Sequence, residues 1–281
     1  MRRFCLYILL VVFSFISFGC ISINSKAEII YESQVKKVTF RSKSLGKSMR
    51  FNIYLPKSYK NGKKYPVLYF LHGYTDNEDA WMPDLKLKET ADRLIENDKI
   101  KPLIIVMPQI DNSFGINTDE LINMSLDFSA GKYEDYLYKD LIHYIDSNYN
   151  TIKNRNSRYI GGLSMGGFAA LHLAFRHINL FSKVGGHSPA FIEALWLYPN
   201  EELRNERDPI KIALKENLKS IQVYLDCGDN DSFKFYNGCN QLYTILQLKG
   251  VHSEYHLNSG EHNAEYWIAN SEKYLLFYAG K

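Results

Sequence analysis

Residues 162–167, with the sequence GLSMGG, place a serine between a short apolar run and a stretch with the alanine and leucine spacing of a helix. A G-x-S-x-G in that context predicts a sharp turn from strand to helix, in which only small side chains fit two positions either side of the serine. The serine is then held in a strained conformation above the sheet. The helix that starts there directs its free amides and dipole at charge developing beside the hydroxyl. Ser164 is therefore predicted to be a nucleophile. The alternative is that the glycine-rich stretch only caps a helix by chance.

Short apolar runs alternate with amphipathic stretches along the chain, which predicts an α/β fold with a mostly parallel sheet and helices on both faces. The runs expected as buried strands are 66–71, 102–108, 157–163, 181–186, 220–226 and 252–258, preceded by an antiparallel pair at 35–40 and 49–55. The stretches expected as helices are 85–97, 133–148, 164–176, 237–249 and 263–278. With the serine turn at the end of one strand, this order is typical of the α/β-hydrolase fold.

The first 20 residues, MRRFCLYILLVVFSFISFGC, predict an export signal, because a basic start is followed by an apolar stretch and then small residues. The apolar stretch is short for a membrane span. Cys20 resembles the acceptor of a lipoprotein signal, and ordinary cleavage after Ala27 is the alternative. We therefore expect a signal at 1–19, a tether at 20–33 and a catalytic domain at 34–281, outside the cytoplasm and either lipid-anchored or secreted.

Composition excludes several classes of protein. Apolar residues make up 46% and charged residues 23% of the 281 residues, as in soluble globular domains. The net charge of +3 falls to about +1 without Arg2 and Arg3 of the leader, and no basic run resembles a nucleic-acid footprint. No cluster of histidine, cysteine and carboxylate has metal-ligand spacing, so we expect neither a metal nor another cofactor.

A serine hydroxyl needs a base, usually a histidine that is held by a carboxylate, and in this fold the chain order is Ser, acid, His. His262 is the histidine that follows the last expected strand and directly precedes the last expected helix, so it is the predicted base. The other histidines after Ser164 belong to expected helices, strands or earlier loops, at positions 172, 177, 187, 252 and 256. The acid should follow the run 220–226, where Asp226, Asp229 and Asp231 compete and local chemistry does not choose among them.

Two backbone amides are expected to form an oxyanion hole. One is that of Met165, directly after the nucleophile. The other comes from the loop after the run 66–71, where Gly73 permits a close turn and Tyr74 supplies the amide. His72 in the same loop is expected to brace it rather than to transfer protons.

The chain also resembles a family of α/β-hydrolase esterases. The resemblance is carried by YLPKSYKNGKKYPVLYFLHG with Trp81 downstream, by KYEDYLYKDLIHYID, by GGLSMGGFAALHLAF, and by LDCGDNDSF followed by SGEHNAEYW. The family includes esterase D, S-formylglutathione hydrolase, feruloyl and acetyl xylan esterase domains, siderophore esterases and mycolyl transferases. The resemblance implies that Asp231 is the acid, and the chain departs from the family pattern at His177-Ile178 and at His187.

The resemblance and the leader together favour an acyl or feruloyl ester of extracellular carbohydrate as the substrate. The alternatives are a siderophore or small lipid ester, an acyltransferase reaction and, in a different class, a non-catalytic surface binding module. Trp81 and His187 are candidate substrate contacts, although packing is the commoner role for such residues. Cys227 and Cys239 either pair as a disulfide or stay as buried thiols.

Overall fold

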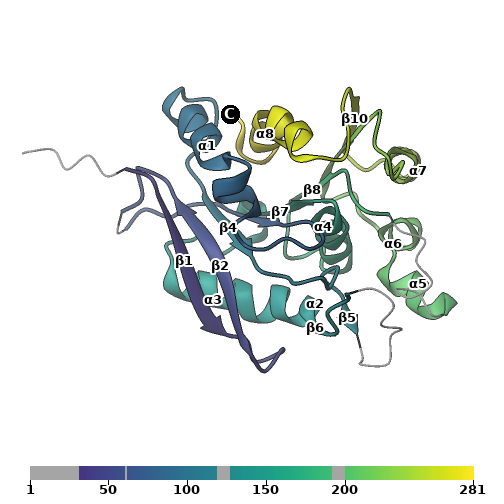
Figure 1. The fold of residues 1–281 in the computed structure, drawn as a ribbon, viewed down its shortest axis with the longest axis horizontal. Helices are drawn as coiled ribbons and strands as arrows, with labels where there is room; N and C mark the ends of the chain where they lie inside the picture. Colours follow the sequence, from purple (N-terminus) through teal and green to yellow (C-terminus); the bar gives the residue numbers. More distant parts are fainter. Residues whose placement is uncertain (1–31, 61, 119–126, 192–199) are drawn as a thin grey trace, which may run out of the picture. The chain divides into compact units, whose positions relative to one another are not determined.

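The computed structural model describes residues 32–60, 62–118, 127–191 and 200–281. The export signal and Cys20 lie outside these residues. The described chain is built on an eight-stranded sheet in which only β1 and β2 run antiparallel to their neighbours (Figure 1). In spatial order the strands are β1 (Gln34–Arg41), β2 (Ser48–Leu55), β4 (Ile104–Pro108), β3 (Val67–Leu71), β7 (Arg158–Leu163), β8 (Lys183–His187), β9 (Gln222–Gly228) and β10 (Ser253–Asn258).

Helices cover both faces of this sheet (Figure 1). One face packs against α1 (Leu87–Glu96) and α8 (Ala264–Ala279), which lie together at the top of the view. The opposite face packs against α3 (Ile142–Asn148), α4 (Met165–Arg176), α6 (Pro209–Lys215) and α7 (Tyr236–Leu248). The predicted α/β-hydrolase fold is thus confirmed, with the apolar runs forming the strands.

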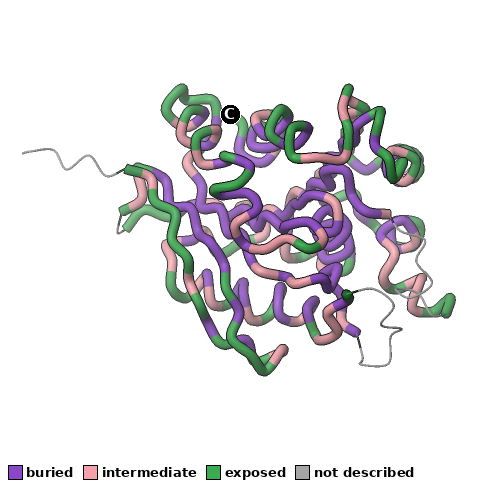
Figure 2. Tube along the Cα trace, in the orientation of Figure 1, coloured by how far each residue is buried: buried purple, intermediate pink, exposed green. Residues whose placement is uncertain are grey.

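The strands β3 and β4 are apolar and buried along their whole length because both of their faces are covered. In β3, Val67, Tyr69 and Leu71 belong to the core on the α4 face, whereas Leu68 and Phe70 belong to the core on the α8 face. This is the alternation of side chains along a strand. Figure 2 shows the result as a continuous buried centre, with exposed residues on β1 and on the outer helices.

Some elements did not follow from the sequence patterns. The expected helix 133–148 forms three successive segments, α2 (Tyr133–Asp135), the π-type turn η2 (Tyr136–Leu141) and α3. The unpredicted short elements are η1 (Ala80–Asp84), η3 (Arg155–Ser157), α5 (Glu201–Arg207), α6 and the hairpin of β5 (Asn117–Thr118) with β6 (Gly131–Lys132). A capping signal could have indicated α6, because the Asp208 side chain accepts the Ile210 amide at 2.8 Å and Pro209 occupies the first turn.

Within the residues that the structure describes, no helix combines the length and the apolar character needed to cross a membrane.

Candidate active site

Ser164 lies on a strained turn between β7 and α4, with φ 51° and ψ −117°. A side chain is excluded on both sides of this turn. A Cβ at Gly162 would come within 2.5 Å of the Gly166 backbone, and a Cβ at Gly166 would come within 2.5 Å of the carbonyl oxygens of Leu71 and His72. These close approaches are the physical reason for the small residues around the serine, and Ser164 itself is partly exposed.

His262 connects the serine to a carboxylate. Its Nε2 lies 2.9 Å from Ser164 Oγ, and its Nδ1 lies 2.8 Å from Asp231 Oδ2. Because a carboxylate only accepts, Nδ1 carries the proton toward Asp231, and Nε2 is then free to accept the serine hydroxyl proton. The chain of hydrogen bonds runs from the acid through the imidazole to the hydroxyl, an arrangement able to activate a nucleophile.

The three aspartates that the sequence left open have different surroundings. Asp231 is the one in contact with His262. Asp229 instead accepts the Gly260 amide at 3.1 Å and so connects the loop after β9 to the loop that carries the histidine. Asp226 is fully buried near the end of β9 and contacts His187.

Asp231 is held as an anion although it is 3% exposed. Burial alone would raise the pKa of its carboxyl group, but the hydrogen bond and charge of His262 lower it, with support from the Cys227 thiol and the Phe233 amide. The net direction is a lowered pKa. The Phe233 amide donates to Oδ1 at 2.8 Å and the Cys227 thiol lies 3.3 Å from Oδ2, so both carboxylate oxygens are fixed.

Three aromatic rings surround the imidazole of His262, and the sequence patterns assigned none of them to the site. The rings of Phe233, Phe235 and Trp267 meet it edge-on, with centroids 5.1, 5.3 and 5.1 Å away. Phe233 is 64% exposed and stacks on Phe235. The signal lay in the quoted stretches LDCGDNDSF and SGEHNAEYW, in which Phe233 and Trp267 stand close to the acid and the base.

The loop after β9, which carries Asp231, packs against the loop between β10 and α8, which carries His262. A Cβ at Gly228 would come within 2.3 Å of the Gly260 carbonyl oxygen. The Asn230 amide donates to that same oxygen at 2.9 Å. Gly260 itself has a φ of 144°, which favours glycine. Contacts between these two loops therefore set the spacing of Asp231 and His262.

The loop after β3 lies beside the nucleophile. A Cβ at Gly73 would be 3.7 Å from Ser164 Cβ and 2.7 Å from the Leu163 side chain, so the loop can approach only because residue 73 is glycine. Tyr74 follows directly in this loop, and Met165 is the first residue of α4. The two residues predicted for the oxyanion hole are thus on the segments that flank Ser164.

His72 ties the loop after β3 to the rest of the sheet. Its Nδ1 lies 2.7 Å from the Gly73 carbonyl oxygen, and its Nε2 accepts the Ile110 amide at 2.9 Å. Burial lowers its pKa. A neutral ring that donates at Nδ1 and accepts at Nε2 satisfies both contacts, as a brace requires.

The two predicted substrate contacts, Trp81 and His187, do not reach a surface that a substrate could touch. Trp81 is 1% exposed, donates Nε1–H to the Leu71 carbonyl at 3.0 Å and stacks on Phe70 at 3.8 Å. His187 is fully buried and stacks on Tyr274 at 3.6 Å. These predictions were wrong because both rings belong to the core between the sheet and α8. Cys227 and Cys239 are buried free thiols in this structure.

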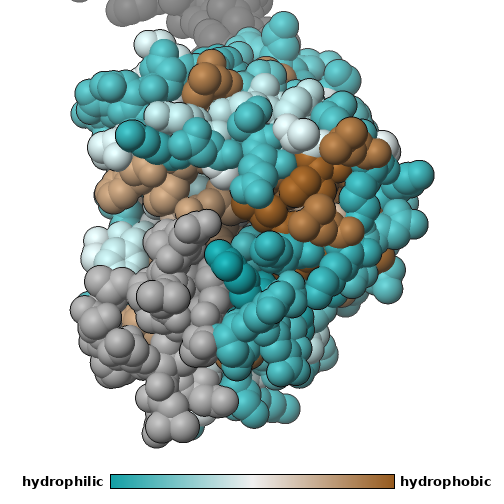
Figure 3. All heavy atoms as spheres, turned by 90° about the vertical axis from the view of Figure 1, so that its right-hand side faces the viewer, coloured by the Kyte–Doolittle hydropathy of each residue, from teal (hydrophilic) through white to brown (hydrophobic). Residues whose placement is uncertain are grey.

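Two cavities adjoin the imidazole or its aromatic neighbours. One of 410 Å³ opens beside His262, Asp231 and Tyr236, and one of 440 Å³ is lined by Phe191, Phe233 and Phe235 together with residues of α6 and α7. Figure 3 shows the side of the molecule with α5–α7, where apolar groups interrupt a mostly hydrophilic surface.

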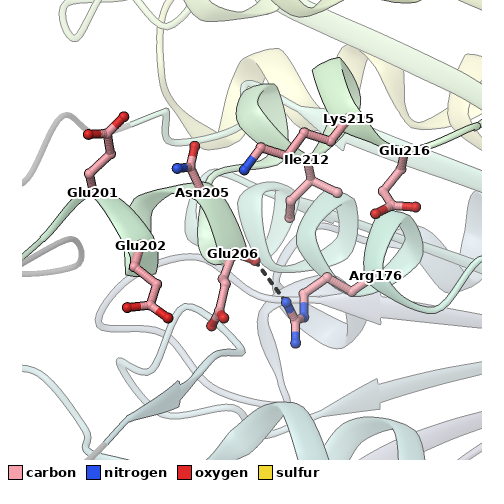
Figure 4. Close-up of a pocket in the computed structure, with 8 residues that line it drawn as sticks. All are labelled: Arg176, Glu201, Glu202, Asn205, Glu206, Ile212, Lys215 and Glu216. Atoms are coloured by element: carbon pink, nitrogen blue, oxygen red, sulfur yellow. Dashed lines mark hydrogen bonds between the residues drawn. The ribbon is translucent and has the colours of Figure 1, made fainter.

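A further pocket of 720 Å³ carries none of the predicted site residues (Figure 4). It lies where α5 and α6 meet the end of α4, and Arg176 Nη1 donates there to the Glu206 carbonyl at 3.1 Å. In the described parts of the chain, no three histidine, cysteine or carboxylate side chains are grouped so that they could hold a metal ion.

Residues 42–274 match the family model described as "Putative esterase". The chain belongs to this esterase family. It is therefore a carboxylic ester hydrolase, and the resemblance inferred from the sequence is confirmed. The family match extends from the start of the loop after β1 into α8, so it includes all three residues of the Ser164–His262–Asp231 chain.

The relatives agree with this membership. An endo-1,4-beta-xylanase/feruloyl esterase of Xylanibacter ruminicola is 31% identical over 230 residues, which cover 80% of this chain and 28% of the relative. An S-formylglutathione hydrolase of Arabidopsis thaliana is 25% identical over 264 residues, covering 85% of this chain and 90% of the relative. Among solved structures, a ferulic acid esterase is 29% identical with a TM-score of 0.75, covering 88% of this chain and 97% of that one.

Proposed function

We propose that this esterase works through an acyl-enzyme formed on Ser164. His262 takes the serine proton as Oγ attacks the ester carbonyl and then gives it to the leaving alcohol oxygen; Asp231 orients the imidazole and stabilises its charged form. Water, deprotonated by His262, then releases the acid and restores the hydroxyl. The observation that carries this mechanism is the pair of hydrogen bonds at 2.9 and 2.8 Å that join the three side chains.

The backbone amides of Met165 and Tyr74 are proposed to hold the oxyanion of the tetrahedral intermediate. Their position on either side of Ser164 supports this role, as does the N-terminal start of α4 at Met165, where helix amides point out of the helix. Gly73 supports it as well, because its lack of a side chain brings the Tyr74 segment close to the serine.

An acyl or feruloyl ester of extracellular carbohydrate is the proposed substrate. Support comes from relatives named feruloyl and ferulic acid esterase, and from the partly exposed Phe233 ring next to His262, on which an aromatic or sugar ring could stack. The predicted export signal supports a location outside the cytoplasm. Lipidation of Cys20 would tether the enzyme to the membrane. A mature N-terminus at Glu28, found by mass spectrometry, would exclude that tether.

The test is a panel of esters with the purified protein and a Ser164→Ala control. Hydrolysis of p-nitrophenyl acetate and of methyl ferulate or acetyl xylan, absent in the control, is the expected result. No hydrolysis of any ester would indicate a binding module. Ester formation with an added sugar acceptor at the expense of hydrolysis would indicate a transferase, and preference for siderophore or lipid esters would replace the carbohydrate substrate.

A further inference from the structure

A second carboxylate, Asp226, is buried beneath the proposed catalytic residues and is not used by the proposed chemistry. It is 0% exposed and receives three hydrogen bonds, one from His187 Nδ1 at 2.8 Å and two from the hydroxyls of Tyr266 and Tyr274 at 2.7 and 2.8 Å. Burial raises the pKa of both tyrosines, so their hydroxyls stay protonated and donate. Three donors replace the water that a carboxylate loses on burial.

The partners of Asp226 lie on the segments that carry the proposed catalytic residues. The His187 carbonyl, at the end of β8, accepts the Ser164 amide at 2.9 Å. The Asp226 carbonyl accepts the Ser188 amide at 2.8 Å, so the ends of β8 and β9 are joined by backbone and side-chain bonds together. The pair of Asp226 with His187 therefore lies directly below the nucleophile turn.

Tyr266 connects Asp226 to the histidine loop. It stands in the first turn of α8, four positions after His262. Its ring packs against Gly260, where an added Cβ would come within 2.7 Å of the ring. Its hydroxyl also accepts the Asn258 side-chain amide at 3.1 Å, at the end of β10. The ring thus touches the loop before His262, while the hydroxyl is fixed from two neighbouring strands.

We propose that Asp226 is a positioning residue for the esterase reaction, acting through Tyr266 on the loop that places His262 against Ser164. The inference rests on the proposed roles of Ser164 and His262. A displaced imidazole transfers protons less well, and misplacement by about 1 Å can lower a rate by about 100-fold. Asp226 is fully buried and therefore does not contact the substrate. Replacing Asp226 should slow the proton transfer by His262 rather than weaken substrate binding.

Tyr274 offers a matched control. It donates to the same Asp226 oxygen over nearly the same distance, and its ring is also buried. Its position is two turns further along α8, about 12 Å along the helix axis. Tyr266→Phe and Tyr274→Phe each remove the hydroxyl that binds Asp226 and keep the ring, so both should lower Tm by about 2–4 °C, and Tyr266→Phe somewhat more because it also loses the hydrogen bond from Asn258.

The two variants should differ in catalysis. Tyr266→Phe should lower kcat/KM for methyl ferulate by about 10- to 100-fold with little change in KM, whereas Tyr274→Phe should stay within about twofold of the wild type. An alkoxide leaving group needs the proton from His262 more than p-nitrophenolate does. Tyr266→Phe should therefore impair methyl ferulate more than p-nitrophenyl acetate, an asymmetry that loss of stability alone does not produce.

Equal effects of the two tyrosine variants on kcat/KM, or equal loss with the two esters in Tyr266→Phe, would overturn the positioning role. Ser164→Ala separates this failure from that of the proposed function. A Ser164→Ala enzyme that still turns over refutes the proposed mechanism, whereas an inactive one leaves the tyrosine comparison valid. Asp226→Asn should enlarge the leaving-group asymmetry, and if that variant does not fold, the tyrosine pair carries the test.

Discussion

Asp226 in β9 and Asp231 in the loop after β9 each pair with a histidine, with nearly the same local geometry and different surroundings. In both, a histidine Nδ1 lies 2.8 Å from the carboxylate, His262 on Asp231 and His187 on Asp226. The other ring nitrogen differs. His262 Nε2 meets the partly exposed Ser164 hydroxyl at 2.9 Å, whereas His187 Nε2 meets the hydroxyl of Tyr278, which is fully buried, at 3.3 Å.

The comparison shows that an aspartate–histidine pair does not by itself define a catalytic site. His187 and Asp226 are 0% exposed, so no ester can reach them. Their hydrogen bonds connect strands and a helix. The pair at His262 has the added requirements of a catalytic site, an open side and a hydroxyl held on a strained turn.

Replacing Ser164, which contacts His262, should have the largest effect on turnover. We expect Ser164→Ala to lower ester turnover by about 10⁴-fold or more, because the three residues act as a unit. Ser188→Ala is the control, since Ser188 lies next to His187 and its buried hydroxyl has no hydrogen-bond partner within the described chain. That variant should stay within a few-fold of the wild type. Near-normal turnover of a folded Ser164→Ala enzyme would contradict the proposed nucleophile.

Asp231→Asn should reduce turnover by about 10⁴-fold, because an amide favours the wrong imidazole tautomer and does not stabilise the imidazolium. Asp229→Asn, which changes a carboxylate two residues away that accepts the Gly260 amide, should have a much smaller effect. Steady-state kinetics of both folded variants would check this. The reverse order of effects would show that the acid is misassigned while leaving the nucleophile unchanged.

The histidines should separate stability from catalysis. His187→Gln leaves the buried Asp226 with only its two tyrosine donors among the described residues, and loss of the hydrogen bond from the ring should lower the free energy of unfolding by about 1.5–3 kcal/mol. His262→Gln should abolish most turnover, and because the His262 side chain is 9% exposed against 0% for His187, we expect it to cost less stability. Denaturant unfolding and steady-state kinetics on both variants test this contrast between loss of stability in His187→Gln and loss of turnover in His262→Gln. If His187→Gln proved as stable as the wild type, the pair of His187 with Asp226 would not stabilise the fold.

The smallest expected effect is on stability in acid. The pKa of Asp231 is lowered in the folded protein, so its contribution to stability is present above the unfolded value near 4 and is lost as pH falls through the folded pKa. The difference in Tm between the wild type and Asp231→Asn should therefore shrink as pH falls below about 4. Thermal unfolding from pH 3 to pH 7 would measure it, and a difference that stays constant or grows in acid would contradict the direction.

Much of the fold could be predicted because each β–α unit carries its own signals. The eight strands of the main sheet lie close to their predicted positions, and for β3 and β4 the reason is that strands covered on both faces must be apolar throughout. The short elements were not predicted because two to seven residues carry too little periodicity, as in α5 and α6. Caps such as Asp208-Pro209 were the remaining local signal.

By itself the sequence determined that Ser164 stands on a tight turn after a buried strand, because the small residues that such a turn needs all lie within residues 162–167. The tertiary structure decided which aspartate faces His262 and which histidine lies in the core. These outcomes depend on how the ends of β8, β9 and α8 come together, and contacts such as that of Gly228 with Gly260 join residues far apart in the chain. Spacing along one segment carries no record of such distances, so local chemistry did not distinguish Asp226 from Asp231 and only the family resemblance had implied Asp231.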